Sequence, residues 1–157
     1  MTNTKITETK IFLDLEMTLI YDWFEDRSII DNNIKIIRDF ADEYKHIEKF
    51  YLFSMAIWSR EDVEKFDNSR LKKELELSLG KELECIYMED IYKKILKNNN
   101  ILINVYFSDI FMFEPKTNFF IEWIRDTNQK GEFILFDDTV EDSEYIFKDR
   151  NFIFIKM

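Results

Sequence analysis

The sequence contains very little glycine, proline, cysteine or histidine. There are 2 Gly, 1 Pro, 1 Cys and 1 His among 157 residues. So few glycines exclude the glycine-rich loops that cradle phosphates in nucleotide-binding folds. The single Cys85 excludes an internal disulfide and a thiolate metal cluster, and we expect it to be a small buried hydrophobe. The single His46 lies in a polar stretch and is expected at the surface, which leaves Ser-His-Asp chemistry without support.

Long apolar runs and an excess of basic residues are also absent. Every apolar run is shorter than the roughly 20 residues of a membrane span, and the start, MTNTKITETK, lacks the basic-then-apolar pattern of a secretory signal. We therefore expect a cytoplasmic protein without membrane contact. The formal net charge of −10 argues against extensive nucleic-acid binding, because that affinity depends on Lys and Arg neutralising phosphates. A local basic patch remains compatible with this charge.

Large apolar residues are abundant, and their spacing predicts strands. Hydrophobic residues make up 46% of the chain, which predicts one folded domain over residues 1–157. Apolar runs without polar alternation are typical of parallel strands covered on both faces. Such runs occur at residues 10–13, 50–53, 103–107, 133–136 and 152–155.

Helix patterns separate these runs. We expect helices over residues 31–44 behind an Asp or Asn cap, 60–79 between a Ser59 cap and Gly80, 90–97, and from about 115 to 126. Asp62 stands where a capping box with Ser59 requires an acid. Alternating strands and helices predict an α/β fold: a single doubly wound, mainly parallel sheet with helices on both faces.

Polar residues gather where the predicted strands end or helices begin. Asp14 and Glu16 follow the first run, Ser54 follows the second, Lys116 opens the last helix, and Asp137 with Asp138 follows the run at 133–136. Ligands of doubly wound sheets bind outside the carboxyl ends of the strands. Carboxylate oxygens favour Mg²⁺, which leaves other coordination positions to water and a substrate phosphate. The set therefore predicts a phosphate site with a divalent cation.

In this order the residues resemble the motifs of the haloacid dehalogenase-like superfamily of aspartate-nucleophile phosphohydrolases. Its first motif, Asp-x-Asp-x-Thr plus an apolar residue, is similar to DLEMTL at residues 14–19 except at one position. The resemblance implies that Asp14 is the nucleophile, that Glu16 is the general acid and base, and that Thr18 belongs to the phosphate-binding residues. It also implies that the Glu16 backbone carbonyl joins Asp14 as a Mg²⁺ ligand.

The later motifs of the same family match the rest of the chain. The resemblance implies that Ser54 binds the phosphoryl group and that Lys116 neutralises charge beside the nucleophile. Asp137 and Asp138 are similar to the acidic pair that holds Mg²⁺, and Asp142 lies in the turn that follows. The implied activity is a Mg²⁺-dependent phosphomonoesterase with an aspartyl-phosphate intermediate, acting on a phosphorylated substrate such as a nucleotide or a nucleic-acid phosphate end.

Glu16 departs from this family pattern, because the second acid is usually Asp. One extra methylene moves the carboxyl group, and proton transfer needs heavy atoms about 2.6–3.2 Å apart. Three outcomes stay open: a pocket adapted to Glu, a slow enzyme that accumulates phosphoenzyme, or a weakened site that serves as a binding or regulatory module. A phosphotransferase or nucleotide-binding protein without this chemistry is a further alternative.

The spacing also leaves no room for a separate cap domain. Residues 19–49 have to hold a flap, one helix and the approach to the next strand, so we expect an open site on a small cap-less member. Trp23 and Phe24 would lie on the flap, where local core packing is favoured over stacking on a base. Residues 61–100 either pack on the sheet or lean over the site. In open members of the family, oligomerisation is one way to cover such a site.

Overall fold

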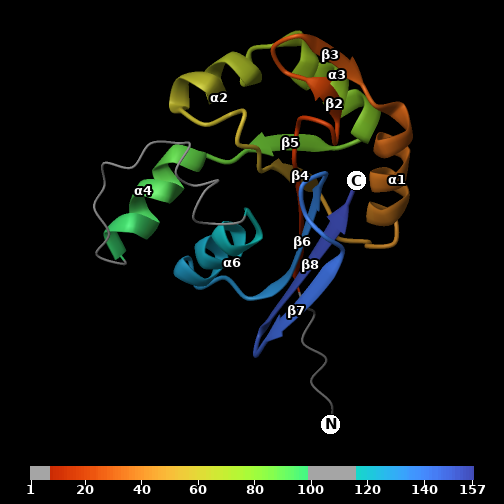
Figure 1. The fold of residues 1–157 in the computed structure, drawn as a ribbon. Coiled ribbons are helices and arrows are strands. Elements are labelled where there is room, and N and C mark those ends of the chain that lie inside the picture. The colour runs from red at the N-terminus through yellow and green to blue at the C-terminus, as the bar shows by residue number, and fades with distance from the viewer. Residues whose placement is uncertain (1–7, 99–115) are drawn as a thin grey trace.

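The computed structural model describes residues 8–98 and 116–157, which form eight strands and five helices (Figure 1). The elements in chain order are β1 (Thr9–Leu13), β2 (Ile20–Asp22), β3 (Asp26–Ile29), α1 (Asp31–Ala41), β4 (Lys49–Leu52), α2 (Arg60–Asp67), α3 (Arg70–Leu79), β5 (Glu82–Cys85), α4 (Met88–Asn98), α6 (Lys116–Asp126), β6 (Gly131–Asp137), β7 (Ser143–Phe147) and β8 (Arg150–Lys156).

A six-stranded sheet in the order β5-β4-β1-β6-β8-β7 forms the centre of the fold. Neighbouring strands are parallel except β7, which runs antiparallel to β8 at one edge. From β1 the chain moves outward to β4 and β5, and then returns to build β6 on the other side of β1. The strand order therefore reverses between β1 and β6, the position where open α/β sheets bind ligands. The predicted α/β architecture with a mainly parallel sheet is confirmed.

Alternate residues of the strands enter two different cores. Ile11 and Leu13 of β1 pack with the mostly aliphatic cluster under α1, α2 and α3, whereas Phe12 packs with the cluster under α4 and α6. Figure 1 shows α1 and α3 on one side of the sheet and α4 and α6 on the other. Burial on both faces explains why the central strands lack polar alternation.

The second core is strongly aromatic. Phe120 of α6 is fully buried, and its ring lies 4.9 Å from that of Phe12, 5.0 Å from that of Phe53 and 5.9 Å from that of Phe154. These contacts are edge-to-face, the arrangement that the ring quadrupoles favour. They fix the first turns of α6 against the ends of β1 and β4, and so position Lys116 at the start of that helix.

Several predicted boundaries differ from the structure. The predicted helix 60–79 is two helices, because Ser69 caps a new helix by accepting from Lys72 N. The capping box of Ser59 with Asp62 and the left-handed cap at Gly80 are both confirmed. The predicted Asp or Asn cap of the first helix is wrong, since Ile30 holds that position without a side-chain hydrogen bond.

Other predictions were incomplete or lie beyond the described ranges. The first helix ends at Ala41 rather than at residue 44, and strands β5 and β7 and the β2–β3 hairpin were not predicted as strands. The predicted strand 103–107 falls outside the described residues. Within residues 8–98 and 116–157, no helix combines the length and apolar character needed to cross a membrane.

Candidate functional site

Two acids from opposite ends of the sequence meet where the strand order reverses. β1 and β6 are parallel, and their register pairs Leu13 with Phe136 at their ends. One residue further along both strands, Asp14 and Asp137 therefore stand side by side, and Asp14 N donates to Phe136 O at 2.9 Å. Both acids are buried, Asp137 completely. This pairing is the arrangement that the sequence predicted.

Lys116 places its ammonium group between these two carboxylates. Its Nζ lies 2.9 Å from Asp14 Oδ1 and forms a second ion pair with Asp137 Oδ2. The Lys116 side chain is only 8% exposed, and its Nζ also lies 5.7 Å from the centre of the Phe53 ring. Burial by itself lowers the pKa of Lys116, but the two carboxylates outweigh it and raise that pKa above its usual range. The lysine is therefore a fixed positive charge.

The surroundings of Asp14 and Asp138 favour protonation of these two carboxyl groups or binding of a cation. Burial raises the pKa of Asp14 to about 7, although Lys116 opposes that rise. Burial also raises the pKa of the neighbouring Asp138, which is partly exposed. A carboxylate taken out of water in this way gains most from an additional cation.

The donor set fits a divalent metal ion. Asp14, Asp137 and Asp138 each offer an oxygen, and these oxygens lie within 4.8 Å of one another. Carboxylate oxygens suit Mg²⁺, and Lys116 supplies one positive charge against three acids. Asp137 is also fixed in orientation, because its Oδ1 accepts from Thr139 N at 2.8 Å and from Thr139 Oγ1 at 2.7 Å.

Thr18 and Ser54 lie at the same edge of the sheet and are both buried. Thr18 Oγ1 has no hydrogen-bond partner in the described part of the chain, whereas the Thr18 carbonyl accepts from Asn33 Nδ2 at 3.0 Å. A buried hydroxyl without a partner is costly and leaves a donor ready for a ligand. Ser54 follows β4, whose residue Leu52 pairs with Leu13, and its Oγ accepts from Ala56 N at 3.2 Å.

Glu16 does not join the acidic group. It is half-buried, and its Oε2 accepts a hydrogen bond from Trp23 N at 3.0 Å. Trp23 lies between β2 and β3, so this bond ties the hairpin to the loop after β1. The carboxylate that the family resemblance assigns to proton transfer is engaged with the backbone of the flap.

The flap itself is anchored through Trp23. This side chain is 6% exposed, and its ring lies 5.7 Å from that of Phe66 in α2. The Arg27 guanidinium lies 3.7 Å from the Trp23 ring, and Arg27 Nε donates to Trp23 O. The expected core packing is confirmed for Trp23 and is wrong for Phe24, which is 78% exposed.

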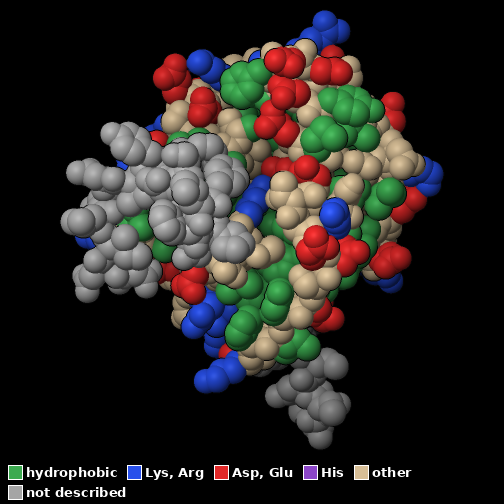
Figure 2. Space-filling model, in the orientation of Figure 1, with side chains coloured by type: hydrophobic (Ala, Val, Ile, Leu, Met, Phe, Trp, Pro, Cys, Tyr) green, Lys and Arg blue, Asp and Glu red, His purple; other side chains and the backbone are tan. Residues whose placement is uncertain are grey.

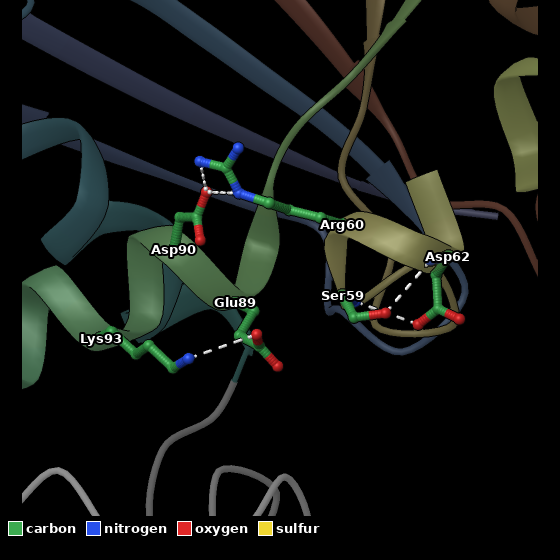
Figure 3. Close-up of polar contacts among 6 residues, drawn as sticks. All are labelled: Ser59, Arg60, Asp62, Glu89, Asp90 and Lys93. Atoms are coloured by element: carbon green, nitrogen blue, oxygen red, sulfur yellow. Dashed lines mark hydrogen bonds and ion pairs between the residues drawn. The ribbon is translucent and has the colours of Figure 1, made fainter. Parts of the chain in front are cut away.

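The loop that leads away from Ser54 is fixed by polar contacts between α2 and α4 (Figure 3). The hydroxyl of Ser59 accepts from Asp62 N, and Arg60 pairs with Asp90 at 2.8 Å across the two helices. Glu89 N also donates to Trp58 O at 3.1 Å. These contacts hold the start of α4 against the Ser54 loop.

The remaining candidates lie outside the group. His46 is exposed and Cys85 is buried, both as expected. Asp142 Oδ1 accepts from Lys156 N at 2.7 Å and so serves the β7 connection. Sequence reasoning missed Thr139, whose signal is its place two residues after Asp137, where a short polar side chain closes a turn.

Acidic side chains dominate the surface near the flap. Figure 2 shows Asp and Glu gathered on the part of this face where Figure 1 places β2 and β3, with Lys and Arg mostly at the rim. Glu25 and Asp26 of this hairpin are exposed. Salt screens the repulsion between this surface and a polyanion beyond a Debye length of about 8 Å at physiological salt, but the repulsion remains at contact.

Comparisons of the chain with protein-family models, curated proteins and solved structures find no match.

Proposed function

We propose that the protein is a Mg²⁺-dependent phosphomonoesterase with a haloacid dehalogenase-like fold that works through an aspartyl-phosphate intermediate. One observation carries the proposal: Asp14 and Asp137, 123 residues apart, flank the buried Lys116 at the point where the strand order reverses. A nucleophilic carboxylate, a fixed cation and a cluster of metal-binding oxygens are the parts that phosphoryl transfer requires.

In this mechanism, a carboxylate oxygen of Asp14 attacks the phosphorus atom, and the bond from phosphorus to the leaving oxygen breaks. Lys116 stabilises the charge on the transferring oxygens, and the hydroxyls of Ser54 and Thr18 donate to them. Water then attacks the acyl phosphate, which returns Asp14 and releases inorganic phosphate. Asp14, Asp137, Asp138 and the Glu16 carbonyl would hold Mg²⁺, which offsets the charge that develops on the phosphoryl oxygens when it is bound.

The proposed mechanism also uses the Glu16 side chain for proton transfer. Its carboxyl group would protonate the leaving oxygen and later accept a proton from the attacking water. Its Oε2 accepts a hydrogen bond from Trp23 N at 3.0 Å, so the proton is carried either by the other oxygen, Oε1, or by Oε2 after the bond to Trp23 N breaks. Proton transfer by Oε2 would therefore require a local movement of the flap, whereas transfer by Oε1 would not.

The same hydrogen bond favours a second candidate function. A Glu16 carboxylate that permanently holds the flap would leave a binding or regulatory module with a metal site and little or no turnover. One variant distinguishes the two candidate functions by its effect on the rate. Glu16→Asp should lower the rate of an enzyme adapted to glutamate, whereas in a weakened site it should raise the rate.

The proposal also includes the class of substrate, the domain organisation and the cellular location of the protein. The substrate is a phosphorylated compound such as a nucleotide, and polynucleotide ends are disfavoured by the net charge of −10. We further propose a single domain over residues 1–157 without a cap domain, located in the cytoplasm.

The test is hydrolysis of an aryl phosphate with and without Mg²⁺. The full chain is compared with Asp14→Asn and with Asp142→Asn, a control that removes a nearby acid outside the group of Asp14, Asp137 and Asp138. We expect Mg²⁺-dependent phosphate release that Asp14→Asn abolishes and Asp142→Asn retains. Release that persists in Asp14→Asn would refute the nucleophile. No release by any form, together with Mg²⁺ binding in a titration, would favour the binding module.

A further inference from the structure

The two edges of the central sheet are built differently. At one edge, β5 alternates buried Leu83 and Cys85 with exposed Glu82 and Glu84. Charged side chains of this kind keep an edge strand from pairing with another chain. At the other edge, β7 presents Tyr145, Ile146 and Phe147, which are 45%, 74% and 42% exposed. β7 carries one exposed acid, Glu144, but it lacks Lys and Pro and pairs with β8 in regular register without a bulge.

This edge therefore carries more exposed hydrophobic side chains and fewer charges than the β5 edge. Figure 2 shows hydrophobic side chains gathered on the lower part of this face, where Figure 1 places β7 and β8. Tyr145 and Phe147 pack on the inner strand β8. The Tyr145 ring lies 5.9 Å from the Phe154 ring, and the Phe147 ring lies 5.9 Å from the Phe152 ring. Ile146 points to the opposite face. Within residues 8–98 and 116–157, no strand pairs with the outer side of β7.

The hairpin geometry identifies which backbone groups face outward. β7 and β8 are joined by the two residues Lys148 and Asp149, so Phe147 and Arg150 form the closing pair. A two-residue loop is closed by a hydrogen-bonded pair, and such pairs alternate along antiparallel strands. Tyr145 and Ser143 therefore bond inward to β8. The N–H and C=O groups of Glu144 and Ile146 point away from the sheet.

We propose that the outer edge of β7 pairs antiparallel with β7 of a second copy of this chain, so that the two sheets become continuous. A two-fold axis at Tyr145 sets Glu144 opposite Ile146 of the partner, and both pairs use the outward backbone groups. Tyr145 then faces Tyr145 of the partner in a non-hydrogen-bonded pair, where side chains approach most closely. Aromatic pairs at such positions stabilise sheets.

Charge and turn geometry select this register. Moving the axis to Glu144 would set two glutamates directly opposite each other, which is destabilising. Moving it to Ile146 would require Lys148 to act as a strand residue, but its φ of 44° lies in the left-handed region of the turn. A shift by one residue would place the backbone groups of Tyr145, which bond to β8, opposite the outward backbone groups of the partner, so hydrogen bonds between the two copies could not form. The register at Tyr145 also brings the negatively charged Asp142 near the positively charged Lys148 of the second copy.

Sedimentation over protein concentrations from about 1 µM to about 1 mM measures the association, because a single strand pair gives a small interface of modest affinity. We expect a monomer–dimer equilibrium that shifts toward monomer by at least tenfold in Ile146→Lys. Leu77→Lys, at an equally exposed apolar position on α3, should leave it unchanged. A monomer at every concentration, or an equal effect of both variants, would overturn the proposal.

Disulfide trapping tests the register. Under mild oxidation Tyr145→Cys should form a covalent dimer, since residues on the axis face each other within about 4.5–5.5 Å. Ile146→Cys should not, because the two copies of residue 146 are diagonal neighbours about 7–8 Å apart. Cys85 is buried and common to both variants. Trapping through position 146 but not 145 would refute the arrangement. Neither experiment depends on phosphatase activity, so this inference and the proposed function succeed or fail separately.

Discussion

Replacing Lys116 by Met removes the only positive charge that contacts Asp14 and Asp137 in the described part of the chain. Methionine keeps most of the aliphatic volume, so the packing of α6 on the Phe53 ring changes little. The two carboxylates remain buried and lose their common partner. Removing one member of a buried ion pair typically costs about 3–5 kcal/mol. We expect the free energy of unfolding of Lys116→Met to fall by an amount in that range.

The loss of folding stability in Lys116→Met should depend on pH. Burial already raises the pKa of Asp14 to about 7, far above its ordinary 3.8, and removal of Lys116 raises it further. A carboxyl whose folded pKa exceeds its unfolded pKa binds a proton more tightly in the folded state. Its contribution to stability is therefore complete below pH 3.8 and is lost as pH rises through the folded pKa. Lys116→Met should be destabilised less at pH 5 than at pH 8.

Urea unfolding in EDTA at both pH values measures the effect, with Lys130→Met as the control. Lys130 pairs with Asp149 at the surface and should cost less than about 1 kcal/mol. Adding Asp14→Asn to Lys116→Met removes one stranded charge and should restore part of the lost stability. The reasoning is refuted if Lys116→Met loses the same stability at both pH values, or if Asp14→Asn makes the double variant less stable.

Three further predictions concern parts of the fold that support the site. Gly131→Ala should destabilise by more than about 1 kcal/mol in thermal unfolding, because its φ is 129° and an added Cβ would lie 2.3 Å from Glu8 O; an unchanged melting temperature would contradict this. Phe120→Ala should cost about 3–5 kcal/mol in urea unfolding, since this buried ring contacts five others; a cost below about 1 kcal/mol would show that the aromatic core collapses around the gap. Burial raises the pKa of the Cys85 thiol, so a disulfide reagent at pH 8 should react only after denaturant is added, and fast reaction of the native protein would contradict its burial.

The sequence predicted the centre of this fold better than its edges. β1 and β6 are buried on both faces, and β4 and β8 alternate buried with mostly half-buried residues; the unbroken apolar runs of all four identify them. β5 reads ELEC and β7 reads SEYIF, two short edge strands in which charged or exposed residues dilute the pattern. Their pairing depends on partners distant in sequence, which a local pattern cannot contain. The break in the helix at Ser69 was likewise hidden, because apolar spacing continues across it.

The acidic group was predictable for a reason of geometry. Parallel strands end at the same edge, so residues that follow buried runs converge whatever the loops between them do. Asp14 and Asp137 come together on that basis, and Lys116 joins them from the first position of α6. The contacts of Glu16 were not predictable, because they depend on how the hairpin after Thr18 folds back. Thr139 was missed for the same reason, since its role appears only once Asp137 is placed.

Glu16 is one methylene longer than the Asp that the family resemblance leads one to expect, and its carboxylate is bonded to the flap. Its longer side chain reaches Trp23 N at 3.0 Å, and Trp23 is fixed in turn by Phe66 and Arg27. The oxygen that accepts this bond is Oε2, one of the two oxygens of the carboxyl group. Acid catalysis by the same group needs the proton and the freedom to turn toward a leaving oxygen. Under the proposed function, the flap and the proton transfer therefore share one side chain, because Oε2 is bonded to Trp23 N and Oε1 is the oxygen left to face a leaving group.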